Sequence, residues 1–529
     1  MELERKVIHK NKAPLTAFAQ LITEEDYNLP EYKPDIMTII KSRGTIVLDE
    51  TSVEEEYVTL HGKMNFEILY QGEGSRPVID CLKGSIPFQE RVHAEGLQGK
   101  DNTIVKTTVE DMGVVVINSR KLSLRGLTEV QVIVNDGEEM ELPVASEYPS
   151  EYQVQQENRT VLRLMEQKRD RMRFKQEVML PKEKPNIQTM LWTDVRLEQT
   201  ALRQSSDGLE LTGMLCVFAL YQTGQEEAFT WYESSVPVSS QLACELPRTD
   251  GFYQVKTIAV QSSLEPREDL DGELRNLAAE CFVEVELSVW QEEQMELLKD
   301  AYCMSKELHV HRHTEEMWQM AMKNDALISF DAQQQLPGTK EALYLCDGSP
   351  QVKVQEISLQ DGNIVIRGTC DMEVLYLTAE DSMPLGCARF GIPFEGEMEA
   401  GNVVDGDYID VEASVYRVQC TLNDSSTMTC RGELQVGLMA FHREQVQLPD
   451  DLVEEPLDLD ALQKQPGMIG YVVRGKDELW DIAKRFHTTK QELMETNQLT
   501  QEELQPGQKL LVMKHIYLDV GDNKNFHGK

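Results

Sequence analysis

The chain has 529 residues, which is too long for one compact core and predicts three to five domains. Hydrophobic residues make up 41% of the chain, which is enough for globular folding, and the formal net charge is -39. This charge argues against nucleic acid and anionic membrane surfaces as partners, because both attract positively charged protein surfaces.

The first residues, MELERKVIHKNKAPLTAFAQL, carry charges but no continuous apolar run, so we expect no signal peptide. No segment of the sequence approaches the roughly 18 apolar residues that a membrane-spanning helix requires. The ten cysteines are scattered without a CxxC pair, and Cys216, Cys281 and Cys370 lie in strand-like apolar runs. This usage predicts buried, reduced thiols in a cytosolic protein, and no spacing supports a zinc site.

Three segments share one pattern, which indicates a threefold duplication. They are VTLHGKMNFEILY at 58–70, LELTGMLCVFALY at 209–221 and IVIRGTCDMEVLY at 364–376. Each segment has glycine at its fifth position and ends in Leu-Tyr. The glycines, Gly62, Gly213 and Gly368, lie 151 and 155 residues apart, so the pattern indicates duplicated domains rather than a solenoid of short units.

The flanks of these segments repeat as well. A Leu-Pro pair precedes each segment, and its prolines are Pro30, Pro181 and Pro337. Two copies continue as LPEYKPDI and LPKEKPNI, whereas the third reads LPGTKEAL and lacks the second proline. A further proline follows each terminal tyrosine after 16 or 17 residues, at positions 87, 237 and 393.

The repeated segment reads as a β-strand, because apolar and polar residues alternate with a period of two. Its central glycine indicates a β-bulge or a close approach of a neighbouring backbone. Further alternating runs follow, among them LRGLTEVQVIV and ECFVEVELSVW. Each unit of about 150 residues is therefore predicted to be mostly antiparallel β, as a sandwich or a curved sheet.

After Gln445 the pattern changes. Residues 446–467 are acidic, are interrupted by prolines and have no long apolar period, so we expect an extended linker. Residues 468–516 hold seven Lys/Arg and seven Asp/Glu, so this segment is neutral and the acidity lies in the rest of the chain.

The neutral segment predicts the order strand, helix, helix, strand. A short strand at 471–473 precedes a helix whose apolar positions are Leu479, Ile482, Ala483 and Phe486. Asp477 is the expected N-cap of this first helix.

The second helix begins with a capping box formed by Thr489 and Glu492. It ends near Asn497, a residue that tolerates a left-handed cap. A turn at Pro506-Gly507 then leads into the closing strand.

This arrangement closely resembles a LysM domain. The matching residues are Tyr471, Asp477, Leu479, Trp480, Ile482, Ala483, Asn497, Leu499, Leu504, Pro506, Gly507, Gln508 and Leu510. The resemblance implies a shallow groove between the first strand–helix loop and the second helix–strand loop. LysM domains usually bind the N-acetylglucosamine of peptidoglycan or chitin in that groove.

One loop of the predicted groove departs from the family pattern. Where LysM domains commonly have Gly-Asp-Thr, this chain has Lys476, Asp477 and Glu478. Two long charged side chains would crowd a sugar and would lose hydration when it bound, whereas they suit a charged protein surface. The alternative is that both side chains extend into solvent and sugar binding survives. We take Lys476, Asp477, Glu478, Asn497 and Gln498 as the expected docking residues.

Tandem repeats followed by a LysM domain resemble the SipL-like family of spore coat morphogenetic proteins, whose repeats are SPOCS domains. The stretches LPEYKPDI and GKMNFEILY carry this part of the resemblance. The expected division is three SPOCS-like repeats, an acidic linker, a LysM domain and a tail, at residues 1–150, 151–300, 301–445, 446–467, 468–516 and 517–529.

The resemblance implies a non-enzymatic scaffold in the mother-cell cytoplasm, at the forespore surface. Its LysM domain would bind a SpoIVA-type coat ATPase and so tether the coat, and several repeats on one chain would contact other coat proteins. The main alternative is a peptidoglycan- or chitin-binding protein that uses the LysM groove. We expect neither nucleic acid nor direct membrane insertion.

Other signals carry little weight. His309, His311 and His313 share one strand face, but their spacing of about 6.6 Å is too wide for one metal ion without further ligands. Trp480 could stack on a ligand, although the helix period favours packing against the core of its own domain. The segment GEGS at 72–75 reads as a hairpin turn. No catalytic motif has usable spacing, so we expect no enzyme, no metal and no cofactor.

Overall fold

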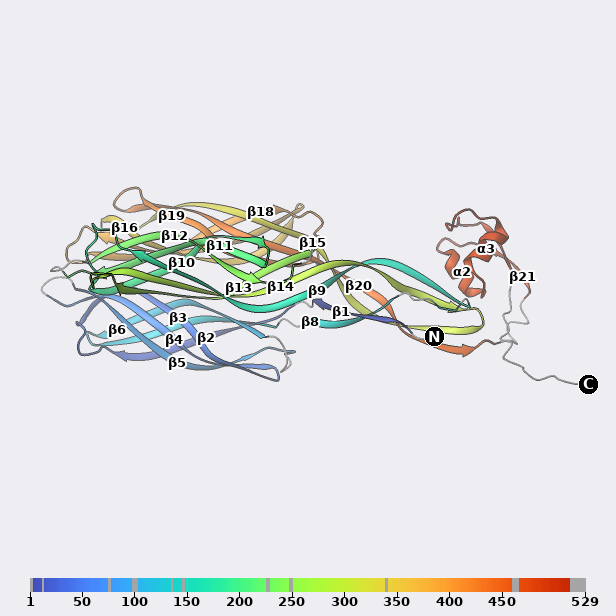
Figure 1. Cartoon of the computed structure of the whole chain (residues 1–529), viewed down its shortest axis with the longest axis horizontal. Coiled ribbons are helices and arrows are strands. Elements are labelled where there is room, and N and C mark those ends of the chain that lie inside the picture. The colour runs from blue at the N-terminus through green and yellow to red at the C-terminus, as the bar shows by residue number, and fades with distance from the viewer. Residues whose placement is uncertain are drawn as a thin grey trace, which may run out of the picture.

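The fold is that of a computed structural model, which describes residues 3–11, 14–74, 78–97, 103–134, 137–144, 148–149, 151–224, 229–246, 251–337, 341–458 and 466–513. Most of these residues form antiparallel strands, so the expectation of a mostly β protein is confirmed. Three β-rich units lie side by side, a stalk of long strands extends from them, and a small helical domain lies beyond the stalk (Figure 1).

Each unit is a sandwich of two three-stranded sheets, and the strand order is the same in all three. The first sandwich pairs the sheet β3 (Ile36–Glu54), β4 (Tyr57–Gly72), β5 (Val78–His93) with the sheet β2 (Leu15–Asn28), β7 (Lys121–Val134), β6 (Thr103–Asn118). The second pairs β10 (Thr189–Ser205), β11 (Gly208–Gln222), β12 (Phe229–Ala243) with β9 (Tyr152–Met179), β14 (Leu274–Cys303), β13 (Gly251–Glu268). The third pairs β16 (Ala342–Gln360), β17 (Asn363–Thr378), β18 (Leu385–Glu399) with β15 (Lys306–Gln335), β20 (Thr427–Pro456), β19 (Tyr408–Leu422).

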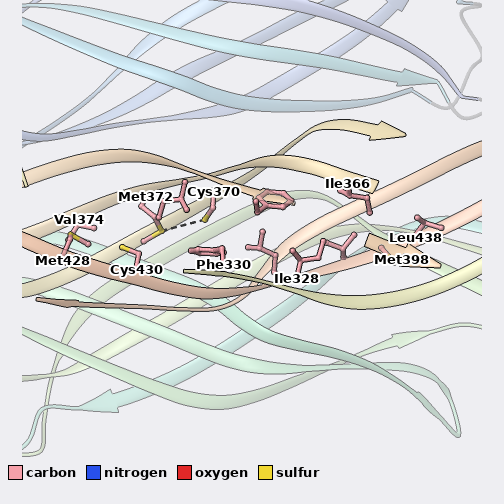
Figure 2. Close-up of a cluster of buried hydrophobic side chains, with 14 of the residues drawn as sticks. Ile328, Phe330, Ile366, Cys370, Met372, Val374, Met398, Met428, Cys430 and Leu438 are labelled. Atoms are coloured by element: carbon pink, nitrogen blue, oxygen red, sulfur yellow. Dashed lines mark hydrogen bonds between the residues drawn. The ribbon is translucent and has the colours of Figure 1, made fainter. Parts of the chain in front are cut away.

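Apolar side chains fill the space between the two sheets of each sandwich. Figure 2 shows the third sandwich, where Cys370, Met372 and Val374 of β17 face Phe330 of β15 and Cys430 of β20. These residues alternate along their strands with more exposed ones, as the period-two patterns predict. All ten cysteines of the chain are free, and six of them are buried.

The repeated glycine lies on the central strand of one sheet in each sandwich. Gly62 is paired with Leu48, directly beside a bulge in β3, and a Cβ added to it would lie 2.4 Å from the carbonyl oxygen of Val47. Gly368 has the same environment, with 2.1 Å to the carbonyl oxygen of Lys353. The predicted bulge and close backbone approach are therefore confirmed, with the bulge on the neighbouring strand.

The Leu-Tyr pair at the end of each repeated segment faces two different cores. Tyr70, Tyr221 and Tyr376 are buried inside their own sandwiches, which agrees with a structural role. The leucines point to the opposite sheet face, where Leu69, Leu220 and Leu375 meet around Trp192 in a core that all three sandwiches share. The repeated pair thus serves folding within each unit and packing between units.

Charged residues surround this shared core. Arg43 of the first sandwich lies 3.5 Å from Asp194 of the second, and Arg196 of the second lies 3.1 Å from Asp347 of the third. Buried Lys41 lies 3.0 Å from Glu373, which closes the set of contacts between the third sandwich and the first. Burial alone would raise the pKa of Asp194, but Arg196 and Arg43 hold it well below its usual value.

Beyond the sandwiches, each unit contributes a two-stranded ribbon to the stalk. The ribbons are β9 with β14, β15 with β20, and the shorter pair β1 (Arg5–Asn11) with β8 (Gly137–Pro143). Buried apolar residues of all three ribbons form one cluster inside the stalk. The cluster consists of Ile8, Met140, Leu142, Val161, Met295, Leu297, Met317, Val446 and Leu448.

The stalk corrects two expectations about the chain's division. The expected boundary between residues 300 and 301 falls inside β14, and the first half of the expected linker at 446–467 belongs to β20. Val446 and Leu448 alternate with polar residues and are buried, so a period of two was present in the acidic segment. Pro449 is tolerated because it lies at a register shift between β15 and β20. Residues 459–465 and the tail at 517–529 lie outside the described residues.

The glycine environment generates a stability prediction. Gly62→Ala places a methyl group against the carbonyl oxygen of Val47, and we expect a cost of about 1–3 kcal/mol in the free energy of unfolding. Gly113→Ala is the matched control, since Gly113 also lies in a strand but its added Cβ would meet only ordinary contact at 3.6 Å. Denaturant unfolding of both variants measures the difference, and equal stabilities would contradict the close-approach explanation.

Candidate functional site

The helical domain beyond the stalk has the predicted order of elements. β21 (Met468–Val472) pairs with β22 (Lys509–Met513), and between them lie α2 (Leu479–Arg485) and α3 (Lys490–Asn497). Leu479, Ile482 and Ala483 are buried in its core, as the helix period predicts. Among the described residues, no helix has the length and apolar composition that crossing a membrane requires.

The helix caps agree with expectation at α3 and differ at α2. The capping box is present, since the Glu492 amide donates to Thr489 Oγ1 at 3.0 Å and the Glu492 carboxylate accepts from the Thr489 amide at 3.3 Å. The expected N-cap of α2 at Asp477 is wrong, because that position is Glu478. Asp477 belongs to a turn closed by a bond from its own amide to the Arg474 carbonyl oxygen, which directs its carboxylate back into the loop.

Asp477 therefore organises the loop from within. Its Oδ2 accepts hydrogen bonds from the Tyr471 hydroxyl at 2.6 Å and from the Arg474 amide at 2.8 Å. These two bonds lower the pKa of Asp477 below its usual value. Asp477 therefore has a structural role in the loop, since its carboxylate is hydrogen-bonded within the domain.

Lys476 and Glu478 flank Asp477, and both are exposed. Within the part of the chain that the structure describes, neither side chain forms a hydrogen bond or an ion pair. The second loop lies beside them, because the Gly507 amide donates to the Val473 carbonyl oxygen at 2.8 Å and the Val473 amide donates to that of Gln508 at 2.9 Å. Two loops therefore meet at this end of the domain. The first loop exposes the opposite charges of Lys476 and Glu478, which are not paired within the described residues.

Asn497 and Gln498 have different roles. Asn497 donates to the carbonyl oxygens of Leu493 and Leu511 and accepts from the Leu511 amide at 2.6 Å, which ties the end of α3 to β22. Its polar groups are thus engaged inside the domain. The left-handed cap expected at Asn497 is formed by Gln498 instead, with φ 54°. Lys476, Glu478 and Gln498 are the exposed members of the predicted docking set.

The sequence patterns missed an extensive contact between this domain and the stalk. Asp300, near the end of β14, accepts hydrogen bonds from Trp480 Nε1 and Lys484 Nζ, both at 2.8 Å, and from Arg312 at 3.0 Å. Tyr302 packs edge-on against Trp480 with ring centroids 4.9 Å apart, and its hydroxyl donates to the Thr488 carbonyl oxygen at 2.7 Å. We call this set of contacts the Asp300 junction.

The junction revises the expected role of Trp480. Its ring is buried, as predicted, but it lies between the core of its own domain and the stalk residues Tyr302 and Met304. A signal for this contact exists in the sequence LLKDAYCM, where Lys299 and Asp300 interrupt an apolar run, and of these two only Asp300 is buried. A buried carboxylate needs a cationic or hydrogen-bonding partner, although the sequence does not name it.

The electrostatics of Asp300 favour its ionised form. Burial would raise the pKa of Asp300, but the hydrogen bonds from Lys484 and Trp480 and the charges of Lys484 and Arg312 together lower it. The carboxylate therefore holds two cations of different elements, α2 and β15, in one place.

The histidine strand does not assemble a metal site among the described residues. His309 lies 3.5 Å from Glu455, and His313 lies 3.5 Å from Glu315. Both contacts are those of ordinary surface side chains on the stalk.

The Asp300 junction generates a prediction. Asp300→Asn leaves Lys484 and Arg312 facing a neutral side chain, which we expect to weaken docking of the domain by about 2–5 kcal/mol. Hydrogen–deuterium exchange should show faster exchange in α2. Because the pKa of Asp300 is lowered, its contribution is complete above the usual aspartate pKa of about 3.9 and is lost only as pH falls further. The difference in exchange between the wild-type chain and Asp300→Asn should therefore stay constant between about pH 5 and pH 8.

Comparisons with known proteins agree with this domain content. The family described as SipL, SPOCS domain, matches residues 35–117 and 342–423, and the LysM domain family matches residues 471–512. The SPOCS matches cover β3 to β6 and β16 to β19, and β10 to β13 repeat the same strand order in the second sandwich. No curated protein and no solved structure matches the chain significantly. Two SPOCS regions followed by a LysM domain are the domain content of SipL-like proteins, and they support a sporulation-related protein with a module of the peptidoglycan-binding type.

Proposed function

We propose that this chain is a non-enzymatic scaffold of spore coat assembly. Its LysM domain would dock a SpoIVA-type coat morphogenetic ATPase, and this contact would tether the coat at the forespore surface in the mother-cell cytoplasm. The three sandwiches would supply contacts to other coat proteins.

The observation that carries this proposal is the charged loop of the LysM domain. Lys476 and Glu478 are exposed on either side of the structurally fixed Asp477, at the end of the domain where its two loops meet. A neutral sugar offers hydrogen bonds but no opposite charge to replace the hydration that such side chains lose when they are covered. A protein surface with complementary charges can replace that hydration with ion pairs. Its charge complementarity to Lys476 and Glu478 also increases the association rate and the specificity of binding.

The position of the domain supports a tether. The LysM domain lies beyond a stalk built from ribbons of all three units, so its loops are held away from the sandwiches (Figure 1). Separate surfaces on one chain allow several weak contacts to act together through effective concentration.

The alternative is binding of N-acetylglucosamine polymers, and the LysM match is the observation that favours it. In that case Lys476 and Glu478 extend into solvent and leave the loop backbone accessible to the sugar. Charge reversal in the loop distinguishes the two functions. It should change the affinity for a charged protein partner, whereas the affinity for a neutral glycan depends little on the sign of a surface charge.

We expect Lys476→Glu and Glu478→Lys, each in the full chain, to weaken binding of purified SpoIVA-type ATPase about tenfold, which corresponds to about 1.4 kcal/mol. The effect should fall at high salt, because exposed charges are screened. Titration calorimetry or biolayer interferometry measures the affinities. Lys182→Glu and Glu183→Lys are the matched controls, since they reverse the same charges on an exposed turn of the second sandwich.

Sedimentation with insoluble peptidoglycan is measured in parallel. Binding of the wild-type chain to the ATPase, with loss in the loop variants only, supports the tether. Binding to peptidoglycan without binding to the ATPase would establish the glycan alternative. Unchanged ATPase affinity in both loop variants would show that this loop is not the docking surface.

A further inference from the structure

The Asp300 junction decides which face of the LysM domain a partner can reach. Trp480 and Lys484 both lie on α2, and both are bound to the stalk through Asp300. The Tyr302 hydroxyl reaches the Thr488 carbonyl oxygen between the helices, so the stalk covers the face of α2 that carries Trp480 and Lys484. The outer face of α3 stays open.

A groove lies between α3 and the stalk. Its volume is about 630 Å³, and its walls come from residues 489–502 of the LysM domain and from Gln153 of β9. Gln153 is the register partner of Tyr302, and side chains of directly opposed residues in antiparallel strands point to the same sheet face. The Asp300 junction, which holds Tyr302 against Trp480, therefore also places Gln153 at the groove.

The lining indicates the chemistry of an occupant. Gln153, Gln491 and Gln498 place side-chain amides in the walls, and such groups can donate and accept hydrogen bonds; the Gln491 amide already donates to Glu495 at 2.9 Å. Lys490 and Glu502, also in the lining, pair with each other at 2.8 Å. Met494 and Leu499 supply apolar contact between them. This combination suits an extended peptide, whose backbone amides and carbonyls pair with such groups while its side chains meet the apolar residues.

A sugar polymer fits the groove less well. Trp480 is the one tryptophan among residues 466–513; the residue is 5% exposed, and its ring is directed toward Tyr302 and Asp300. It therefore offers no flat apolar face on which a sugar ring could pack. The lining of the groove itself contains no aromatic residue among the described residues.

Building on the proposed docking function, we propose that the partner-binding surface continues from the LysM domain onto the stalk. An extended peptide segment of the partner protein would lie in the groove between α3 and β9, in contact with Gln153. Asp300 would act as a positioning residue, because it holds the two walls of the groove together without touching the partner.

The test uses the full chain with purified SpoIVA-type ATPase as the probe. Gln153→Arg places a long charged side chain in the groove and should weaken binding at least tenfold. Gln156→Arg is the matched control, since Gln156 is exposed on the same strand, three positions away, and so belongs to the opposite face. It should bind as the wild-type chain does.

Asp300→Asn tests the positioning role, because it loosens the stalk from α2 while every residue that lines the groove is unchanged. We expect weaker binding, again by about tenfold, with exchange in β22 unchanged to show that the LysM domain stays folded. In the wild-type complex, hydrogen–deuterium exchange should slow together in residues 489–502 and around Gln153.

The outcomes separate this inference from the proposed function. If the wild-type chain does not bind the ATPase, both fail. If it binds and the two variants bind equally well, only the composite surface is overturned. Tighter binding by Asp300→Asn would overturn it as well, because the stalk would then compete with the partner. Loss of peptidoglycan binding in Gln153→Arg, with ATPase binding retained, would make the occupant a glycan and would overturn the peptide assignment.

Discussion

Leucine side chains from one position of each repeat meet around Trp192, in a buried core to which all three sandwiches contribute. It holds the three sandwiches side by side, with their long strands directed toward the same end (Figure 1). Because those strands continue beyond the sandwiches, their alignment brings three ribbons together into the stalk. The stalk in turn provides the surface against which the LysM domain packs. A loss of packing at Trp192 would therefore also disturb the alignment of the ribbons in the stalk.

The repeats can pack in this way because their sequences have diverged. Arg43, Asp194 and Ser349 occupy equivalent positions, since they pair with residues 67, 218 and 373 of the three central strands. Three copies of one charge at this place would repel one another, whereas these three side chains attract, with Ser349 donating to Asp194 at 2.7 Å. The same divergence marks the turns after the Leu-Pro pairs. Arg120 and Arg275 each donate to the carbonyl oxygens of their turn, and Ser426 stands at that position in the third repeat.

The Asp300 junction joins the folding of the chain to its proposed function. Removing any one of the two cations and the indole donor would leave the buried carboxylate less compensated, so the junction favours the orientation of the LysM domain in which all of them are in place. In that orientation the loop with Lys476 and Glu478 and the open face of α3 are both exposed. The proposed docking surface is thus as much a property of the stalk as of the LysM domain.

Features that depend on local patterns could be predicted from the sequence. Period two identified the central strands, the intervals between Gly62, Gly213 and Gly368 identified the duplication, and the spacing of Leu479, Ile482 and Ala483 identified a helix of the LysM domain. The capping box at Thr489 followed from local hydrogen-bond chemistry in the same way. Such features arise from the geometry of a single strand or helix, so neighbouring residues suffice to predict them.

Contacts between residues that are far apart in the chain could be seen only in the folded structure. Trp480 and Asp300 are 180 residues apart, and no periodicity connects an acid in one strand to an indole in a distant helix. The charges and prolines after Gln445 indicate a linker, whereas the burial of Val446 and Leu448 needs ribbons from other repeats. The hydrogen bonds between Asn497 and Leu511 likewise require α3 to lie against β22, so no local pattern reveals them. In each case the deciding partner comes from a remote segment, and burial against that partner is a property of the assembled fold.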